Sequence, residues 1–212
     1  MKTMKTTCLI LSALLALGGA NAVASDTMIS TIDYATFSGA TIQGQVLGTG
    51  ITVGNSPVNL DSISFYVHIN NNSNTLLTAY LFDTISSTPI CASGSINTST
   101  YAQYSDQFLT FGNLTGTTAL AADTDYFVAI SGNNTFSQVY LTMPYAATSS
   151  YGWTTDGNFY AHSADTWALF GSGAVLQFSI SATPVPEPAS YAAILGIGAF
   201  GALGVRRIRR PR

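Results

Sequence analysis

Charge is the scarcest property of this sequence, because only 8% of its 212 residues are charged. Soluble domains usually carry about 25% charged residues. A nucleic-acid-binding protein needs clustered Lys and Arg to neutralise phosphates. The sequence holds 7 Lys and Arg in total, which argues against that class of protein.

The two signs of charge are also separated along the chain. Residues 1–24 contribute +2, residues 25–183 contribute −9 and residues 184–212 contribute +4, which sum to the formal net charge of −3. The middle segment contains no Lys, no Arg and no Glu. Every cation therefore lies in one of the two end segments, and the segment between them is purely anionic.

Residues 1–24 have the pattern of an export signal. Lys2 and Lys5 precede the apolar run CLILSALLALGGA, and small residues follow at Ala22 and Ala24, the A-x-A positions of a cleavage site. The apolar run is shorter than the roughly 18 residues that a membrane span requires. We therefore predict a cleaved secretory signal peptide.

Removal of that signal leaves Cys91 as the one cysteine of the remaining chain. A single thiol forms no intrachain disulfide, so residues 25–183 must fold by packing alone or pair with another chain. A segment of this length buries a sizeable core without crosslinks. Because Cys91 lies in an apolar stretch, we interpret it as a small buried hydrophobe.

Residues 184–212 combine a proline-rich start, an apolar span and a basic end. The prolines favour an extended connector, because proline fixes φ and lacks a backbone donor. Residues 189–205 carry no charge and would reach about 25 Å as a helix, so we predict a single transmembrane helix. Basic residues beside an apolar span stay on the cytoplasmic side. The arginines expected there are Arg206, Arg207, Arg209, Arg210 and Arg212.

The tail contains the triplet Pro186, Glu187 and Pro188, then the Gly/Ala/Leu-rich span, then the Arg cluster. In this order the three features resemble the PEP-CTERM protein-sorting domain, and the triplet carries the likeness. The resemblance implies recognition by exosortase, a membrane protease-transpeptidase of Gram-negative bacteria that also make extracellular polysaccharide. It further implies that the chain is held in the inner membrane, cleaved near the triplet, and then released or attached to the envelope or matrix.

In residues 25–183, apolar and polar residues alternate with a period of two, as in a strand with one buried face. The clearest run is residues 63–69, which places His68 on the polar face. No stretch shows a convincing helical repeat. We therefore predict an all-β domain of eight or nine short strands, an antiparallel β-sandwich of jelly-roll type. The other expected strands are 28–37, 41–53, 75–83, 107–111, 125–131, 139–143, 165–170 and 176–180.

The layout of this domain, with an early strand, the run DYFVAI and a late tryptophan-rich segment, resembles the choice-of-anchor domains of surface proteins with such tails. That resemblance implies no active site. No G-x-S-x-G motif and no zinc-ligand spacing occurs, so we predict that the protein is not an enzyme. His68 and His162, the latter expected in a loop, are interpreted as exposed structural residues.

Asp123 and Asp125 are the candidate metal ligands. They lie two residues apart, so an extended backbone would place both on one face, and calcium prefers carboxylate and carbonyl oxygens. The alternative is turn chemistry, because Asp is favoured where a turn enters a strand, here at Tyr126. A structural Ca²⁺ is the one cofactor that the sequence suggests.

Aromatic residues gather between residues 140 and 170, interleaved with Asp, Asn and His. Aromatic faces stack on sugar rings while polar groups bind hydroxyls, so we select four candidate ligand contacts. They are Tyr151, Trp153, Tyr160 and Trp167. The alternative is that these rings fill the core of the sandwich.

The sequence as a whole predicts an exported, exosortase-sorted protein of the envelope or extracellular matrix, a structural or adhesive component associated with exopolysaccharide. The first alternative is a carbohydrate-binding module that uses the aromatic segment, and a distant one is a secreted hydrolase. The expected partners are exosortase, the inner membrane before processing, and extracellular polysaccharide or envelope components, with no nucleic acid.

Overall fold

The computed structural model describes residues 24–32, 38–42, 44–70, 75–83, 88–133, 137–142, 148–163 and 166–186. The predicted signal peptide, with Ala22, and the sorting segment from Glu187 onward lie outside these residues. Of the residues assigned to cleavage and sorting, Ala24 and Pro186 are described. The described residues include no helix that is long and apolar enough to cross a membrane. Ser25–Pro184 forms a compact unit.

Two antiparallel sheets of nine strands each make up the described part of this unit. Sheet 1 has the order β13-β1-β18-β4-β12-β17, with β8 and β10 also pairing with β4, and β2 with β12. Its strands are β1 (Asp26–Ser30), β2 (Ser38–Thr41), β4 (Val58–Ile69), β8 (Ser105–Phe111), β10 (Ala119–Leu120), β12 (Ser137–Thr142), β13 (Thr148–Ser149), β17 (Val175–Leu176) and β18 (Phe178–Pro184).

Sheet 2 has the order β16-β15-β3-β11-β5-β6-β9, with β14 also pairing with β3 and β7 with β5. Its strands are β3 (Val46–Thr52), β5 (Leu76–Asp83), β6 (Cys91–Ala92), β7 (Ile96–Asn97), β9 (Thr115–Gly116), β11 (Asp125–Gly132), β14 (Thr154–Thr155), β15 (Asn158–Ser163) and β16 (Thr166–Ser172). A single 3₁₀ turn, η1 (Thr98–Thr100), is the helical element among the described residues.

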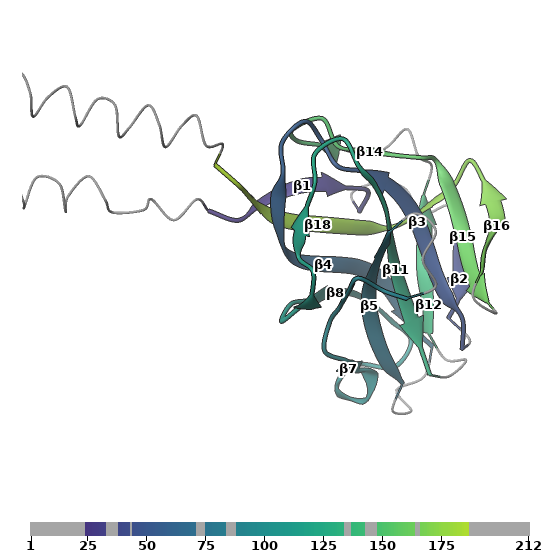
Figure 1. The fold of residues 1–212 in the computed structure, drawn as a ribbon. Helices are drawn as coiled ribbons and strands as arrows, with labels where there is room; N and C mark the ends of the chain where they lie inside the picture. The colour runs from purple at the N-terminus through teal and green to yellow at the C-terminus, as the bar shows by residue number, and fades with distance from the viewer. Residues whose placement is uncertain are drawn as a thin grey trace, which may run out of the picture. The chain divides into compact units, whose positions relative to one another are not determined.

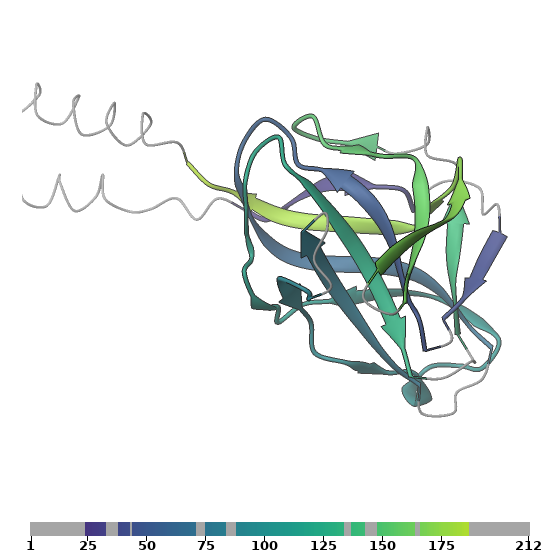
Figure 2. The same cartoon turned by 45° about the vertical axis from the view of Figure 1, so that its right-hand side comes forward.

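The long strands pass back and forth between the two layers. Along the chain β1, β4, β8 and β18 belong to sheet 1, whereas β3, β5 and β11 belong to sheet 2 (Figure 1). In the turned view the strands of one layer again run across those of the other (Figure 2). Because of this alternation, each sheet is assembled from strands far apart in sequence.

The core lies between the sheets and is built by the period-two alternation. In β4 the side chains of Ile63, Phe65 and Val67 are fully buried. Phe65 lies opposite Leu109 of β8 on one side and Phe178 of β18 on the other. Removing a buried ring of this kind costs about 3–5 kcal/mol, so a Phe65→Ala change would remove much of the stability of a typical domain.

The structure confirms the expected all-β class with two antiparallel sheets. Each described stretch of a predicted strand lies in or beside a strand, although β12 ends at Thr142 and the predicted segment 41–53 is divided between β2 and β3. One expectation was wrong: His162 lies in β15 and not in a loop. Its segment reads NFYAHS, which follows Gly157 and makes only one apolar–polar alternation, so the sequence gives a weak strand signal there.

Cys91 is 2% exposed and unpaired, which agrees with its interpretation as a buried hydrophobe. Burial raises the pKa of its thiol because the apolar surroundings disfavour the charged thiolate.

On the outer faces of the sheets, neighbouring strands are linked by hydrogen bonds between hydroxyl side chains, where many other proteins have ion pairs. Thr78 Oγ1 and Ser95 Oγ lie 2.8 Å apart, and Ser64 Oγ and Thr110 Oγ1 lie 3.0 Å apart.

Candidate functional site

The outer face of sheet 2 carries the densest group of aromatic side chains among the described residues. Strand alternation explains their direction: in β11, Tyr126, Val128 and Ile130 are buried in the core, so Phe127 points away from it. Phe127 lies opposite Phe82 of β5 on one side and Gly50 of β3 on the other. We call the group of Phe82, Phe127, Tyr160, His162 and Trp167 the aromatic cluster.

Phe127 is the centre of this cluster. The Trp167 ring stacks on it, with centroids 4.9 Å apart and planes 10° apart. Tyr160 meets Phe127 edge to face at 5.1 Å and 90°, and Phe82 meets Trp167 edge to face at 5.1 Å and 86°. His162 lies 4.9 Å from Trp167, its cross-strand partner. Each aromatic contact of this geometry is worth about 0.5–1.5 kcal/mol beyond the area that it buries.

Gly48 of β3 makes room for this arrangement. A Cβ atom on Gly48 would lie 2.8 Å from Cη2 and Cζ3 of Trp167, closer than such atoms approach. The Trp167 indole therefore lies against the backbone of β3 at Gly48, where no side chain occupies the space. Phe82 is 2% exposed although it points outward and does not belong to the central core, because Trp167 covers it.

Two carboxylates border the cluster. Asp125 accepts a hydrogen bond of 2.6 Å from Thr52 Oγ1 at the end of the β3–β11 ladder. Asp156 accepts a hydrogen bond of 2.7 Å from the Tyr160 hydroxyl through Oδ2 and one of 3.0 Å from the backbone N–H of Asn158 through Oδ1. Burial, followed by the hydrogen bond to Asp156, raises the pKa of Tyr160, so this phenol stays protonated at neutral pH.

A hollow of about 250 Å³ lies between the two carboxylates and the ring of Phe127. Its floor is β3 at Gly50, where a Cβ atom would lie 2.5 Å from Oδ2 of Asp156. Glycine at this position therefore lets Asp156 lie directly over the strand. The hollow combines an aromatic edge, two acceptor groups and the Thr52 side chain, which is the composition of a polar ligand site with few oriented groups.

Two ring nitrogens of the cluster are buried without a hydrogen-bond partner, Nε1 of Trp167 and Nε2 of His162. A buried unsatisfied polar group costs about 1–3 kcal/mol. The cluster thus contains polar atoms that its packing alone does not satisfy.

The four predicted ligand contacts divide into three locations. Tyr160 and Trp167 both belong to the aromatic cluster. Trp153 is 1% exposed and packs in the central core, so its selection as a surface contact is corrected, and the alternative of a core residue holds for it. Tyr151 is 48% exposed, and its hydroxyl donates to Oδ2 of Asp26 at 3.2 Å, which places it beside β1 rather than in the cluster.

Sequence reasoning missed Phe82 and Phe127, which come from β5 and β11 and not from the aromatic segment between residues 140 and 170. The alternating pattern of β11 already places Phe127 on the polar face, opposite its buried neighbours. A large aromatic side chain on the outward face of a strand was the sequence signal that could have identified Phe127 as a surface-site residue. The pairing of this strand with β3, which brings Phe127 near Trp167, had no such signal.

Asp123 and Asp125, the candidate calcium ligands, occupy different settings. Asp123 lies in the turn before β11 with a φ of 50°, and its N–H donates to the carbonyl of Gly54 at 3.1 Å. Asp125 is the first residue of β11 and accepts from Thr52. Within the described ranges no three His, Cys, Asp or Glu side chains gather as a metal site would require. The turn explains Asp123, and calcium binding stays a prediction.

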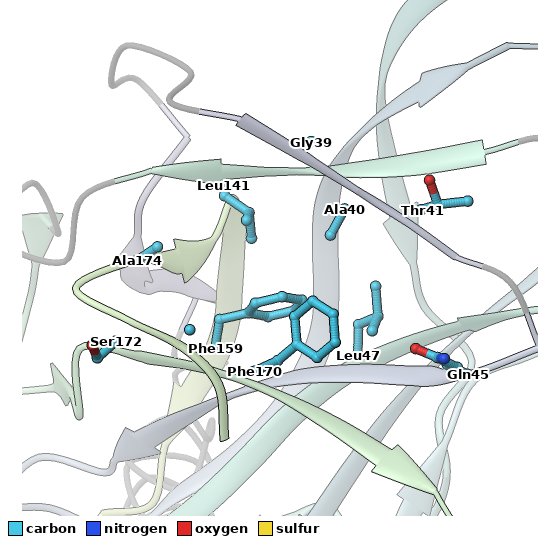
Figure 3. A pocket seen from close by; sticks show the side chains of 11 residues that line it. Gly39, Ala40, Thr41, Gln45, Leu47, Leu141, Phe159, Phe170, Ser172 and Ala174 are labelled. Atoms are coloured by element: carbon cyan, nitrogen blue, oxygen red, sulfur yellow. The ribbon is translucent and has the colours of Figure 1, made fainter. Parts of the chain in front are cut away.

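A second hollow, of about 490 Å³, opens between β2, β15 and β16 (Figure 3). The rings of Phe159 and Phe170 meet edge to face at 5.5 Å there, with Leu47 and Leu141 beside them. The lining is mainly apolar, and its polar side chains are Thr41, Gln45 and Ser172. Gly39 and Leu141 lie close in sequence to segments outside the described residues, so we draw no function from this hollow.

Comparison with known proteins gives a result for the tail. No curated protein matches the chain. The likeness to choice-of-anchor domains therefore gains no support. A family model described as the PEP-CTERM protein-sorting motif matches residues 184–210, which confirms the resemblance carried by Pro186, Glu187 and Pro188. The chain thus carries a PEP-CTERM protein-sorting motif, which marks it as an exported protein that is sorted through the membrane by exosortase.

Proposed function

We propose that this exosortase-sorted protein is a structural or adhesive component of the cell envelope or extracellular matrix, and that it acts by binding polysaccharide rather than by catalysis. The observation that carries the proposal is the aromatic cluster with Asp125 and Asp156 beside it. The sorting motif supports an extracytoplasmic destination for the folded domain, where polysaccharide is available to it.

The chemistry of the cluster suits a sugar ring. The C–H face of a pyranose packs on an aromatic ring, while carboxylates accept hydrogen bonds from the hydroxyls at the edge of the sugar. Asp125 and Asp156 provide such acceptors beside Phe127. The hollow of about 250 Å³ is smaller than the pockets of about 300–1,000 Å³ that hold drug-sized ligands. It therefore suits one sugar residue of a chain that lies along the surface.

The charge of the domain narrows the class of polysaccharide. Residues 25–183 contain no Lys or Arg, so the domain has no permanent cation with which to pair uronic acids, sulfates or phosphates. The nine Asp side chains repel an anionic polymer, and this repulsion increases at low salt. We therefore propose that the ligand is a neutral or amino-sugar polysaccharide.

The test measures binding of the processed protein to immobilised polysaccharides of three charge types: neutral glucan and galactomannan, partly deacetylated chitin, and alginate. We expect binding to one or more members of the first two types and none to alginate. Asp156→Asn and Tyr160→Phe should each weaken binding by about fivefold to thirtyfold, the effect of losing a central contact.

Two matched substitutions control for general effects of these changes. Asp61 accepts a hydrogen bond from Thr183 Oγ1 at 2.7 Å, much as Asp125 does from Thr52. Asp61→Asn therefore removes a similar exposed carboxylate outside the cluster, and Tyr151→Phe removes a similar phenol. Both variants should bind as the natural protein does. Equal losses in the cluster variants and the controls, or no binding to any polysaccharide, would contradict the proposal.

The sorting step has an independent test. Expression with an exosortase, followed by intact-mass measurement, should give a product without the arginines that follow position 205. A product that keeps them would contradict processing of this chain while leaving the binding result unaffected.

A further inference from the structure

The outer face of sheet 1 carries a second ordered set of aromatic and polar side chains. Alternation in β4 buries Phe65 and Val67, so Tyr66 and His68 point outward. In β8 Phe108 lies opposite Tyr66, and Asp106 lies opposite His68. Tyr140 of β12 completes the set beside Tyr66. We call Tyr66, His68, Asp106, Phe108 and Tyr140 the sheet-1 face.

Three rings of this face form a row across three strands. The rings of Tyr66 and Tyr140 lie 5.1 Å apart with planes tilted by 32°. The backbone of Gln177 holds the two tyrosines in place, because Tyr66 N–H donates to the Gln177 carbonyl at 3.0 Å and Gln177 N–H donates to the Tyr140 carbonyl at 2.7 Å. Phe108 is 51% exposed. Strands lie about 5 Å apart, so the row extends over about 10 Å.

Polar groups line the row on both sides. On one side, Nδ1 of His68 lies 2.6 Å from Oδ1 of Asp106, and the Tyr140 hydroxyl donates to the same oxygen at 2.7 Å. On the other side, the hydroxyls of Ser64 and Thr110 lie 3.0 Å apart. The hydrogen bonds from His68 and Tyr140 lower the pKa of Asp106, so the carboxylate is charged at neutral pH.

This pattern differs from that of a protein-binding surface. The centre of a protein interface is a broad apolar area in which charged groups are depleted. Here the apolar strip is one residue wide and has hydrogen-bonding groups along both edges. A polysaccharide chain has the complementary pattern, with C–H faces along its middle and hydroxyls along its edges.

We propose that the sheet-1 face is a second polysaccharide-binding surface, so that one protein molecule bridges two glycan chains. The inference rests on the proposed function, because it assigns the same class of ligand to both faces. The two outer faces belong to opposite layers of one sandwich, whose sheets pack about 10 Å apart. A single stretch of glycan therefore does not reach both, and simultaneous binding crosslinks separate chains or distant parts of one chain.

The charges on the sheet-1 face favour the same class of polysaccharide as those at the aromatic cluster. The sheet-1 face holds one carboxylate, Asp106, whose charge the neighbouring His68 balances only when the imidazole is protonated. No Lys or Arg exists in residues 25–183 to attract an anionic polymer. The occupant is therefore a neutral or amino-sugar chain, as at the aromatic cluster.

A two-layer capture assay tests the bridging. The neutral or amino-sugar polysaccharide that binds best in the panel above is immobilised, the processed protein is bound to it, and the same polysaccharide, soluble and fluorescently labelled, is added. The natural protein should capture the label. Phe108→Ala and Asp106→Asn should still bind the first layer through the aromatic cluster, yet capture at least about fivefold less label.

Asp156→Asn serves as the reciprocal variant, because it should bind the first layer through the sheet-1 face alone, with the weakened affinity expected above, and fail to capture label. Combining Phe108→Ala with Asp156→Asn should abolish both steps. Phe170→Ala is the matched control, since Phe170 is a similarly exposed phenylalanine, at 69%, that belongs to neither face. It should behave as the natural protein does.

Each alternative result has a defined meaning. Full capture by Phe108→Ala and Asp106→Asn would refute the second surface, while first-layer binding would still support the proposed function. Failure of the natural protein to bind the first layer would overturn both proposals. Sedimentation that shows a dimer lost in Phe108→Ala would assign the sheet-1 face to a second copy of the chain and overturn bridging.

Discussion

Gly48→Ala is the substitution that most directly tests how the aromatic cluster is built. Gly48 has an ordinary strand conformation, so the backbone itself accepts alanine. The added methyl group would lie 2.8 Å from two carbons of the Trp167 ring and 3.2 Å from the carbonyl oxygen of Val128. Since the carbonyl belongs to the β11 backbone, the indole must move, and its stacking on Phe127 must loosen.

Two opposing effects set the size of the change. Overpacking of a close contact costs about 1–3 kcal/mol. Replacing glycine by alanine in a strand returns about 0.5–1 kcal/mol, because the unfolded chain loses conformational freedom. The net destabilisation therefore lies between about 0 and 2.5 kcal/mol. For a domain of this length the upper value corresponds to a fall in Tm of about 5–10 °C.

Urea unfolding followed by circular dichroism measures this change, with Gly94→Ala as the control. A Cβ atom on Gly94 meets no atom within 4 Å, so that substitution should be neutral or slightly stabilising. The sequence contains only 2 Trp residues, so a Trp153→Phe background isolates the fluorescence of Trp167. We expect Gly48→Ala to change that emission and Gly94→Ala to leave it unchanged. Equal stability and equal emission in both variants would refute the packing of Trp167 over Gly48.

Three other properties are open to simple measurement. Burial raises the pKa of Cys91, so a thiol reagent should modify it rapidly in urea and only slowly in the folded protein. Asp123 has a φ of 50°, so Asp123→Val should destabilise the protein by about 1–2 kcal/mol in urea titrations and Asp123→Gly should not. Hydrogen bonds from His68 and Tyr140 lower the pKa of Asp106, so this carboxylate contributes stability above its unfolded pKa and loses it as the pH falls through the lower folded value. Asp106→Asn should remove that small acid-side loss in thermal unfolding, whereas an unchanged pH profile would contradict the network; its exposure limits the effect to under about 1 kcal/mol.

The fold class could be predicted from sequence because alternation is a local signal. The alternation from Ile63 to Ile69 predicts which side chains are buried without any knowledge of strand pairing. The burial pattern of β4 confirms that prediction. β15 was missed because its buried residues, Phe159 and Ala161, make only one apolar–polar alternation. Strand pairing is not local, so the order β1-β18-β4, which joins the first and last long strands, had no signal in the chain.

The candidate site could be predicted only in part for the same reason, because strand pairing decides which aromatic rings meet. Tyr160 and Trp167, two of the four selected residues, lie in one group because β15 and β16 pair as antiparallel neighbours. Trp153, which is closer to Tyr160 in sequence, faces the core. Phe127, about forty residues from Trp167, supplies the ring on which that indole stacks. Sequence proximity identifies an aromatic segment, whereas the register of β3 and β11 decides which of its rings share a face.

The scarcity of charge has a structural consequence that connects the two faces. Without Lys or Arg, the domain of residues 25–183 cannot use permanent ion pairs to orient its surface carboxylates. Asp125, Asp156 and Asp106 are instead held by hydroxyl, phenol, amide or imidazole donors. These donors are themselves part of the binding chemistry of a glycan, and they leave lone pairs of each carboxylate available to a ligand. The scarcity of charge and the ordered acceptors on both outer faces therefore favour the same partner, a hydroxyl-rich chain without anionic groups.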